Sequence, residues 1–589
     1  MKRMAAIILC LALVFALTAC ASEGKQKAQG YADVYRAIKA CRSENGARMT
    51  MYNTVTDDIA YGETAQDYSK TNTQVDGIDE GDKIKTDGKY IYYVCGNSID
   101  IYEAAGAGSR RVGCIRSDDE NEGTTCAIYL HDGVLIVVTC RFGFCVYSDA
   151  ADLEGDCNRE CTTVYYYDVS DPAAPKLISS AGQDGSLMTS RLYDGKLYLV
   201  TRYAVYGTVE EDEPASFVPQ YYRNGAASVA DSGCISIMPA VNEANYIVAG
   251  AYDAKTGVQS AQRSVLGAGD DMYMNSQSLY LSAWRFEQVI SDERREGVYT
   301  VTDCADKQFT DIVRLGVSDL SEKARGSVEG YLDGQFAMDE HNGFLRVVTT
   351  SANNYCTIYR DDKYGFENYK YDEEKNKPVN GLYILDGSLN EVSSLTGLAP
   401  DETVKSVRFE GGTAYFCTFR QVDPLFAVDV SDPKAPKVLS ELKISGFSEY
   451  LHPWAEGRLF GLGNEADAKT GFTQNIKLVM FDTSDRADVK AKAVQVLDGV
   501  EWSDALYEHT ALLISPEKNL IGFGSTDKYF IYSYTDEGGF VCDAEISFPE
   551  NTEGCLRCVY AGDFAYAISD AGMRVLGMTD WSTISDVKK

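Results

Sequence analysis

The chain has 589 residues, of which 45% are hydrophobic, and a formal net charge of −33 at pH 7. This composition supports a large buried core and excludes an intrinsically disordered protein. The negative charge repels nucleic acid and anionic lipid headgroups, so neither is an expected partner, whereas cations and basic ligands are attracted.

An apolar run at the N-terminus predicts export. Lys2 and Arg3 precede residues 4–19, a run too short to span a membrane comfortably. It ends in Leu17-Thr18-Ala19-Cys20, which resembles the lipobox of bacterial lipoproteins. We therefore predict a signal peptide over 1–19, a lipid anchor on Cys20 and a location on the outer face of a bacterial envelope membrane. An ordinary secretory signal with an incidental cysteine is the alternative.

Residues 20–68 predict a polar tether with one short helix. Tyr31, Val34, Tyr35 and Ile38 recur at helical spacing and would pack on the following domain. From residue 69 to 589, short runs rich in Val, Ile, Tyr, Phe and Thr alternate with Asp-Gly, Asn-Gly and Gly-Gly turns, which predicts an all-β domain.

A strand-turn-strand pattern recurs through this domain. In each copy a tight turn leads into a second strand that is apolar along nearly its whole length, and a third and a more polar fourth strand follow. We count nine copies, whose turns and second strands read TDGKYIYYVC, HDGVLIVVTC, YDGKLYLVTR, NSQSLYLSAW, HNGFLRVVTT, EGGTAYFCTF, AEGRLFGLGN, EKNLIGFGST and AGDFAYAISD.

A strand that is apolar on both faces needs cover on both faces, and radially stacked four-stranded sheets supply it. The sequence therefore predicts a β-propeller of eight or nine four-stranded blades, nine by the count of copies. Eight blades with an irregular insertion near residues 204–275 are the alternative, and we expect the insert 210–223 to form a surface loop. The repeated Val-Ser-Asp-Pro segments at 169–172 and 430–433 are interpreted as structural turns.

Two segments carry a family resemblance. They read TNTQVDGIDEGDKIKTDGKYIYYV at 71–94 and FRQVDPLFAVDVSDPKAPKVLSELKISGFSEYLHPW at 419–454. In this order they resemble the secreted bacterial proteins defined by a C-terminal beta-propeller domain, a largely uncharacterised family. The resemblance implies a propeller at the cell surface and carries over no activity and no functional residues.

Histidines supply one set of candidate site residues. His131 and His341 precede equivalent turns and are interpreted as turn residues. His452 and His509, with the adjacent Glu508, do not replace a residue of the repeat, and each leads toward an inner strand near the channel. They are candidate binding or acid–base groups, and satisfied histidines at blade junctions are the alternative.

The acidic turn at 76–82 is the second candidate. Asp76, Asp79, Glu80 and Asp82 offer the oxygen ligands that calcium takes, but their spacing differs from that of an EF-hand loop. Calcium is the one cofactor that this turn suggests. The alternative is that these carboxylates accept backbone hydrogen bonds where the tether meets the first blade.

Seventeen cysteines in an exported chain suggest disulfides, and the spacing favours one pair, Cys157 with Cys161 in DCNREC. No nucleophile elbow, phosphate loop or nucleotide fingerprint occurs in the sequence. We therefore expect a membrane-anchored scaffold that binds an extracellular protein, peptide or glycan, and an enzyme is the less favoured interpretation. The alternatives are an extracellular hydrolase or lyase with its site in the channel, and an accessory factor in envelope assembly.

Overall fold

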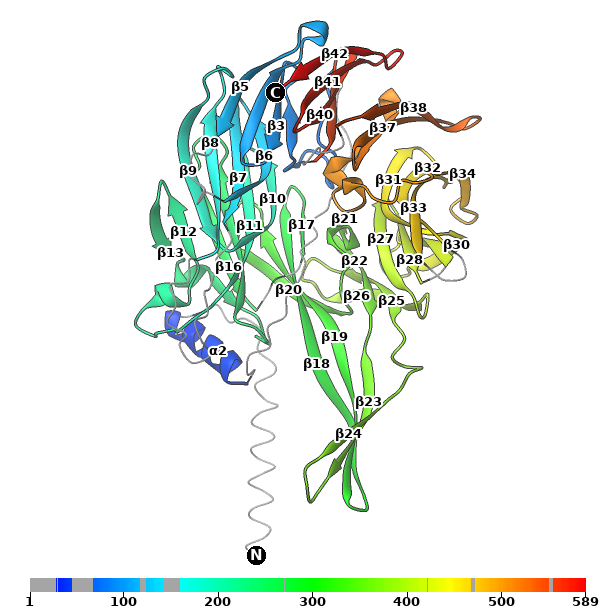
Figure 1. The fold of residues 1–589 in the computed structure, drawn as a ribbon. Helices are drawn as coiled ribbons and strands as arrows, with labels where there is room; N and C mark the ends of the chain where they lie inside the picture. The colour runs from blue at the N-terminus through cyan, green and yellow to red at the C-terminus, as the bar shows by residue number, and fades with distance from the viewer. Residues whose placement is uncertain are drawn as a thin grey trace, which may run out of the picture.

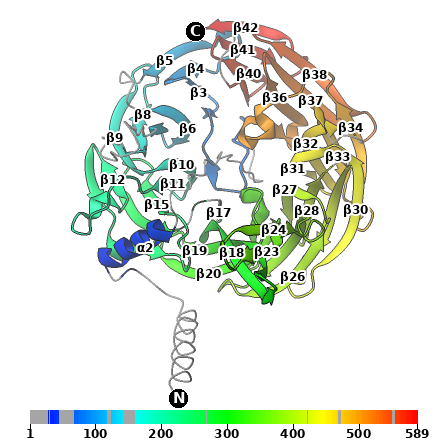
Figure 2. The same cartoon turned by 60° about the horizontal axis from the view of Figure 1, so that its bottom comes forward.

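The strands form nine sheets arranged as a ring around a central channel (Figure 2). The computed structural model describes residues 28, 30–44, 67–116, 123–141, 159–267, 269, 271–420, 422–467, 472–549 and 555–589. Residues 1–19, Cys20 and Cys157 lie outside these ranges. The nine sheets of the described residues confirm the propeller, with nine blades rather than eight.

Each sheet contains a four-stranded unit, which we number blades 1 to 9 in chain order. The first five are β2 (Ile84–Thr86), β3 (Tyr90–Cys95), β4 (Ser98–Glu103) and β5 (Arg110–Arg116); β6 (Thr124–His131), β7 (Val134–Arg141), β8 (Cys161–Asp168) and β9 (Lys176–Asp184); β10 (Ser186–Tyr193), β11 (Lys196–Ala204), β15 (Asn245–Asp253) and β16 (Gln259–Leu266); β17 (Met272–Met274), β18 (Ser278–Glu296), β19 (Tyr299–Gly316) and β20 (Glu322–Glu329); and β21 (Met338–His341), β22 (Phe344–Ser351), β25 (Val379–Leu385) and β26 (Glu391–Leu398).

The last four blades carry no additional strands. They are β27 (Thr403–Glu410), β28 (Thr413–Phe419), β29 (Val422–Asp429) and β30 (Lys437–Ser445); β31 (Phe447–Ala455), β32 (Arg458–Ala466), β33 (Thr473–Asp482) and β34 (Lys490–Val496); β35 (Leu513–Ser515), β36 (Leu520–Ser525), β37 (Lys528–Thr535) and β38 (Gly539–Ser547); and β39 (Arg557–Ala561), β40 (Phe564–Ser569), β41 (Gly572–Gly577) and β42 (Thr583–Lys588).

The second strand of each blade is buried on both faces, as its apolar sequence requires. In β7 every residue except Arg141 is buried, and in β36 all six residues are. The core therefore lies between adjacent blades; Tyr92 and Ile101 of blade 1, for example, pack against Leu135 and Val137 of blade 2. This cover on two sides is what a single two-layer sandwich would not give.

The expected turns between strands are also present. Asp168, Asp429 and Asp482 end the third strand of their blades, and each Oδ1 accepts a hydrogen bond from the backbone N–H two residues later, at 2.9, 3.0 and 3.1 Å. These aspartates are therefore structural.

The insert at 204–275 is not only a surface loop. It forms β12 (Gln220–Arg223) and β13 (Ala226–Val229), which extend blade 2, and β14 (Ile235–Ile237), which pairs in parallel with β16. Phe217 and Val218 are fully buried. The expectation of a surface loop is confirmed for residues 210–216, which are exposed or half-buried and form no strand, and was wrong for 217–223, where Phe217 and Val218 cover the outer part of blades 2 and 3 and β12 begins.

The expected helix is present as α2 (Tyr31–Glu44). Val34 and Ile38 are fully buried against Phe217, and the Tyr35 ring packs edge-on to the Phe217 ring at 5.5 Å. The helix thus covers the insert of blade 3 on the lower side of the ring in Figure 1. No helix in the described part of the chain has the length and hydropathy of a membrane span.

Two neighbouring blades together build a long arm. β18 and β19 pair along their whole length, from Ser278 opposite Gly316 to Glu296 opposite Tyr299, and leave the ring as an extended hairpin (Figure 1). The insert of blade 5 adds β23 (Asn354–Asp361) and β24 (Glu367–Tyr371) to the outer half of β19. The repeat pattern of the sequence did not predict this arm.

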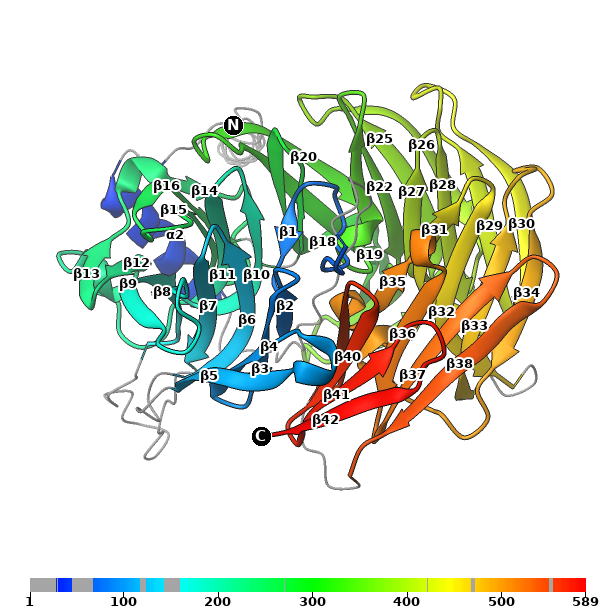
Figure 3. The same cartoon turned by 90° about the horizontal axis from the view of Figure 1, so that it is seen from above.

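Residues 67–83, which we call the crossing segment, run through the centre of the ring before blade 1 begins (Figure 3). Tyr68 forms a β-bridge with Ala561 of blade 9, and β1 (Asp79–Glu80) pairs with β10 of blade 3. Asp82 then exchanges backbone hydrogen bonds with Ile128 of blade 2, at 2.9 and 3.4 Å. The segment therefore ties the last blade to the first three and lies across the channel.

Candidate functional site

The innermost strands carry β-bulges that turn side chains into the channel. The β6, β10, β27 and β31 pairings each skip a residue in the first half of the strand, so that Cys126, Met188, Lys405 and Glu449 are bulged out of the ladder. All four line a cavity in the channel. A bulge re-aims one side chain without breaking the sheet, and this repeated feature directs side chains into the lining of the channel.

The larger cavity has a volume of about 620 Å³ and lies among blades 3 to 8. It combines aromatic surfaces with convergent polar groups, as small-molecule sites usually do. Its aromatic lining is Trp284, Tyr331, Phe336, Tyr450 and Tyr507, and its charged lining is Arg202, Asp271, Asp333, Lys405 and Glu449.

Two carboxylates in this cavity have shifted pKa values. Burial within the channel raises the pKa of Glu449 to about 7; the Lys405 ammonium opposes that shift and the Asp333 charge adds to it. Burial raises the pKa of Asp333 to about 6, again against the Lys405 charge. The Asp333 side chain is nevertheless accessible to solvent from the cavity. Near neutral pH this cavity therefore holds a carboxyl group that can give or take a proton.

The loop that presents Asp333 depends on two glycines. Gly330 and Gly334 have φ of +100° and +88°, a region that side chains with a Cβ disfavour. A Cβ on Gly330 would also lie 2.6 Å from the carbonyl oxygen of Thr350. After this loop, η5 (Gln335–Ala337) places Phe336 beside Tyr450, with ring centroids 6.1 Å apart.

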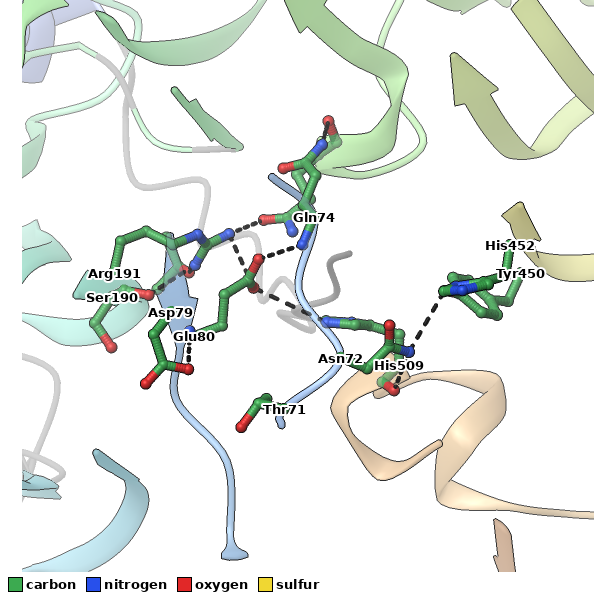
Figure 4. A network of polar contacts seen from close by, with 12 residues as sticks. Thr71, Asn72, Gln74, Asp79, Glu80, Ser190, Arg191, Tyr450, His452 and His509 are labelled. Carbon is green, nitrogen blue, oxygen red and sulfur yellow. Dashed lines mark hydrogen bonds and ion pairs between the residues drawn. The ribbon is translucent and has the colours of Figure 1, made fainter. Parts of the chain in front are cut away.

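The crossing segment borders the cavity through polar contacts (Figure 4). Asn72 Nδ2 donates to the carbonyl oxygen of His509 at 3.1 Å and to the Tyr450 hydroxyl at 3.4 Å. Gln74 Nε2 donates to the carbonyl oxygen of Gln335 at 3.0 Å. These contacts bind the segment to three blades and make the channel a set of pockets rather than an open pore.

The four acidic residues proposed for calcium are held mainly by basic side chains. Asp76 is exposed, Asp79 accepts a hydrogen bond from Lys85 Nζ at 2.6 Å, and Glu80 Oε2 lies 3.4 Å from Arg191 Nη2. Among the residues that the structure describes, no group of three or more Asp, Glu, His or Cys side chains is arranged to hold a metal ion. The calcium site stays a prediction without geometric support.

Asp82, the fourth of these residues, is buried beside two cations. Arg557 Nε lies 3.4 Å from its Oδ1, and the same guanidinium donates to Asp504 at 2.9 Å and to Glu508 at 2.6 Å. Burial raises the pKa of Asp82 to about 6, although Arg557 and Lys85 oppose the shift. Glu508, which the sequence suggested as a binding residue of the channel, thus serves as an ion-pair partner of Arg557.

The two candidate histidines both lie next to Tyr450 in the channel wall, with ring centroids 6.1 and 6.4 Å from that of Tyr450. His452 Nδ1 forms a hydrogen bond with the Tyr450 hydroxyl at 2.8 Å, and His509 Nε2 lies 3.9 Å from Glu80 Oε2. Both rings are buried, and burial lowers their pKa values well below 6.5, with the Arg408 charge adding to the shift of each. At neutral pH they are uncharged groups of a packed network.

A second cavity of about 340 Å³ lies beside the first and shares Met188, Thr189 and His509 with it. Cys126 and Cys140 line it, and their Sγ atoms are 2.7 Å apart. Cys304 and Cys356 form another close pair in the arm, at 3.4 Å. The predicted pair Cys157–Cys161 is not tested, because Cys157 lies outside the described residues.

Sequence reasoning missed Asp333, Lys405 and Glu449. For Lys405 a signal was present, because it stands six residues before the first turn residue Gly411, as Cys126 stands before Asp132 and Met188 before Asp194. Aligning the repeats on their turns would have shown this variable position on an otherwise regular inner strand.

Comparison with known proteins agrees with the fold. The chain is 26% identical over 577 residues to an uncharacterized protein of Methanocaldococcus jannaschii, covering 88% of this chain and 83% of that protein. It is 27% identical over 600 residues to an uncharacterized protein of Archaeoglobus fulgidus, covering 89% of this chain and 85% of that protein.

Solved structures are similar to the chain only at low TM-scores. BamB from Moraxella catarrhalis covers 56% of this chain and 89% of its own, with 12% identity and a TM-score of 0.24. Hsv2 from Kluyveromyces lactis covers 71% of this chain and 96% of its own, with 11% identity and a TM-score of 0.31. The Beta propeller domain family matches residues 68–581, which is most of the chain. The protein therefore belongs to the beta propeller domain family.

Proposed function

We propose that this protein is a cell-surface lipoprotein whose propeller binds an extracellular glycan or peptide in the larger channel cavity. The observation that carries the proposal is the cavity itself, with its volume of about 620 Å³ and its aromatic and charged lining. Aromatic rings offer flat apolar surfaces, and the carboxylates and the Lys405 ammonium can hydrogen-bond hydroxyl, amide or charged groups of a ligand.

The mixed charge of the lining favours a polar ligand over a lipid or a polyanion. Asp271, Asp333 and Glu449 face Arg202 and Lys405, so the cavity carries both signs of charge. The chain as a whole carries −33, which repels polyanions. A short sugar segment or the end of a peptide can form hydrogen bonds with both the acidic and the basic side chains of the lining.

The experiment is a binding screen with oligosaccharide and peptide arrays, followed by titration of the hits. Trp284→Ala removes an aromatic surface of the cavity, and Glu449→Gln keeps the shape but removes the charge. We expect either variant to weaken binding about tenfold or more. Trp502→Ala is the matched control, because Trp502 is 47% exposed and is not part of the cavity lining. Equal affinity of all four proteins contradicts the proposal.

A hydrolase or lyase is the second candidate, and one observation favours it. Glu449 and Asp333 share the cavity and have raised pKa values, of about 7 and about 6. Two carboxyl groups held near neutrality can act as general acid and general base on an extracellular polymer. Product analysis of each bound oligosaccharide or peptide tests this. If the wild-type protein cleaves the ligand and Glu449→Gln binds it without cleaving it, the protein is an enzyme. If the wild-type protein leaves every ligand intact, the binding function stands alone.

The lipid anchor is tested separately. We propose that Cys20 carries it, on the strength of the Leu17-Thr18-Ala19-Cys20 lipobox resemblance. Globomycin should block processing of the precursor, and Cys20→Ala should remove the lipid from the mature protein. Processing that neither the drug nor the substitution changes contradicts the anchor.

A further inference from the structure

The tip of the arm exposes a cluster of large apolar side chains. Val298, Tyr364 and Phe366 are 61%, 64% and 72% exposed, among the highest values for apolar residues in the described part of the chain. They belong to the turn between β18 and β19 and to the turn between β23 and β24. Tyr299 pairs with Asp361, so the two turns lie side by side. Apolar groups gathered at the end of a projection indicate a contact surface.

The charges next to the tip are paired. Arg294 contacts Asp292 at 3.0 Å and Glu296 at 2.8 Å, and Arg295 contacts Asp362 at 2.5 Å. Residues 292–303 and 360–367 together hold four basic and seven acidic side chains, so this end of the arm carries a net charge of −3. It therefore suits an electrically neutral, zwitterionic surface better than an anionic one, because like charges repel and the paired charges gain little from a second set of ions.

The arm points to the side of the ring on which α2 lies (Figure 1). The pairing of β19 with β20 ends at Phe309, which lies opposite Arg285 of β18. We therefore measure the arm from the next residue, Phe286, to Glu296, a length of about 35 Å at 3.2–3.4 Å per residue. Cys20 stands ten positions before Gly30, the residue that precedes α2. Ten residues span at most about 35 Å. A bilayer that holds a lipid on Cys20 is therefore no farther from α2 than the arm projects.

We propose that the tip of the arm inserts Val298, Tyr364 and Phe366 into the outer surface of the bilayer in which Cys20 is anchored. The inference rests on the lipid anchor of the proposed function. Aromatic side chains favour the interface between headgroups and acyl chains, and one lipid anchor gains stability from a second membrane contact. The arm then sets the distance of the ring from the bilayer and its tilt relative to the bilayer plane.

This arrangement also orients the cavity. Ser282 and Trp284 line it and lie on β18 where that strand leaves the blade for the arm. The cavity thus lies at the end of blade 4 from which the arm leaves, which in the proposed arrangement is the end nearer the bilayer.

The test uses the full-length lipidated protein in phosphatidylcholine vesicles whose acyl chains are brominated. Bromine quenches tryptophan emission only within the bilayer. Phe366→Trp places a reporter at the tip, and Val258→Trp is the matched control. Val258 is also exposed, but it lies in the turn between β15 and β16, at the end of the blade away from the arm. Wild-type protein gives the background of the four native tryptophans.

We expect brominated vesicles to reduce the added emission of Phe366→Trp and to leave that of Val258→Trp unchanged. Thermal unfolding of both variants should match that of wild type. Protein that sediments with the vesicles but shows equal emission in both variants overturns the membrane contact and leaves the anchor standing. Protein that does not sediment and lacks a diacylglycerol mass overturns both. If the Phe366→Trp reporter is not quenched, the protein is a dimer and Phe366→Asp makes it a monomer, the tip mediates self-association instead.

Discussion

Arg557 Nε lies 3.4 Å from Asp82 Oδ1, although Arg557 begins the first strand of blade 9 and Asp82 ends the crossing segment. The guanidinium also reaches Asp504 and Glu508, and its side chain is only 1% exposed. One buried cation thus joins the crossing segment, blade 9 and the loop that leads into blade 8. Other blades also share ion pairs, such as Arg458 with Asp536 between blades 7 and 8, but Asp536 is 44% exposed whereas the Arg557 side chain is buried. The contact at Arg557 therefore adds a buried electrostatic interaction where the last blade meets the first.

Arg557→Met should destabilise the fold by about 3–5 kcal/mol, because it removes the nearer of the two cations beside the buried Asp82 and the shared ion-pair partner of Asp504 and Glu508. Urea unfolding at pH 7.5 measures the loss. Arg574→Met is the matched control: its pair with Asp586 is 2.7 Å long but largely exposed, so the expected loss is below about 1 kcal/mol. Similar losses in both variants would mean that Arg557 contributes only as a surface ion pair does.

Acid should destabilise the protein through His452 and His509. Their native pKa values lie well below 6.5, so below pH 6.5 the unfolded chain binds protons that the native state does not. Stability then falls as pH falls, by up to about 1.4 kcal/mol per pH unit for each histidine. Asp82, Asp333 and Glu449 act in the opposite direction, because their pKa values are raised and acid favours their folded forms.

The comparison of wild type with His452→Gln/His509→Gln isolates the histidine contribution. Unfolding free energies at pH 7.5, 6.5 and 5.5 should show a steeper acid loss in wild type than in the double variant. Equal slopes would show that the two imidazoles remain accessible to protons in the native state.

The repeat made the ring predictable from sequence. Second strands such as VLIVVTC need cover on two faces, and the Asp-Gly and Asn-Gly turns fix the register of each hairpin. Asp132, Asp194 and Asn342 indeed have φ near +50°, and each precedes a glycine with positive φ. The nine repeated turns therefore predicted nine blades, and the helical spacing of Val34 and Ile38 predicted the helix. Both predictions rest on local sequence patterns and do not depend on contacts between distant segments.

The channel was less predictable, because its groups depend on bulges and on contacts between distant segments. A bulge shifts the strand alternation by one residue, so Glu449 looks like any polar residue of β31. Likewise the acidic turn suggested calcium, because nothing local shows that Arg191 and Arg557, far along the chain, approach Glu80 and Asp82. The arm was missed because its strands simply continue those of blade 4 with exposed residues.

The crossing segment should tolerate no side chain at Gly81. A Cβ there would lie 2.6 Å from Ala127 Cβ and 3.2 Å from the Tyr129 hydroxyl, so that β6 or the segment must move. Gly81→Ala is expected to cost about 1–3 kcal/mol. Gly30→Ala is the control, because a Cβ at Gly30 meets nothing within 4 Å. Unchanged stability of Gly81→Ala in urea unfolding would show that the segment packs loosely in the channel.

Cys126 and Cys140 should form a disulfide on exposure to oxidised glutathione, and Cys304 and Cys356 should do so more slowly. Cys304 and Cys356 pair directly across antiparallel strands, which holds their Cβ atoms close to disulfide distance. Cys126 is bulged out of its ladder, but its Sγ lies 2.7 Å from Cys140 Sγ, so both bonds need only small shifts. The hydrogen bond between Cys126 and Cys140 lowers the pKa of Cys126, whereas burial raises the pKa of Cys304 to about 12. Because the thiolate is the attacking species, Cys126 reacts first. Each bridge releases two reduced glutathione molecules for one oxidised glutathione consumed.

Peptide mapping without reductant measures both rates, since each bridge lowers the summed mass of its two peptides by two hydrogens. The buried Cys417 and Cys558 are the matched controls. In the structure Cys417 lies opposite Leu425 and Ser406, and Cys558 lies opposite Ala567, so neither meets a cysteine across the sheet. Cys140→Ser should leave Cys126 open to alkylation and leave the rate of the arm pair unchanged. If the arm pair closes first, access of glutathione governs these reactions, because the exposed arm stands outside the ring while Cys140 is buried beside the channel.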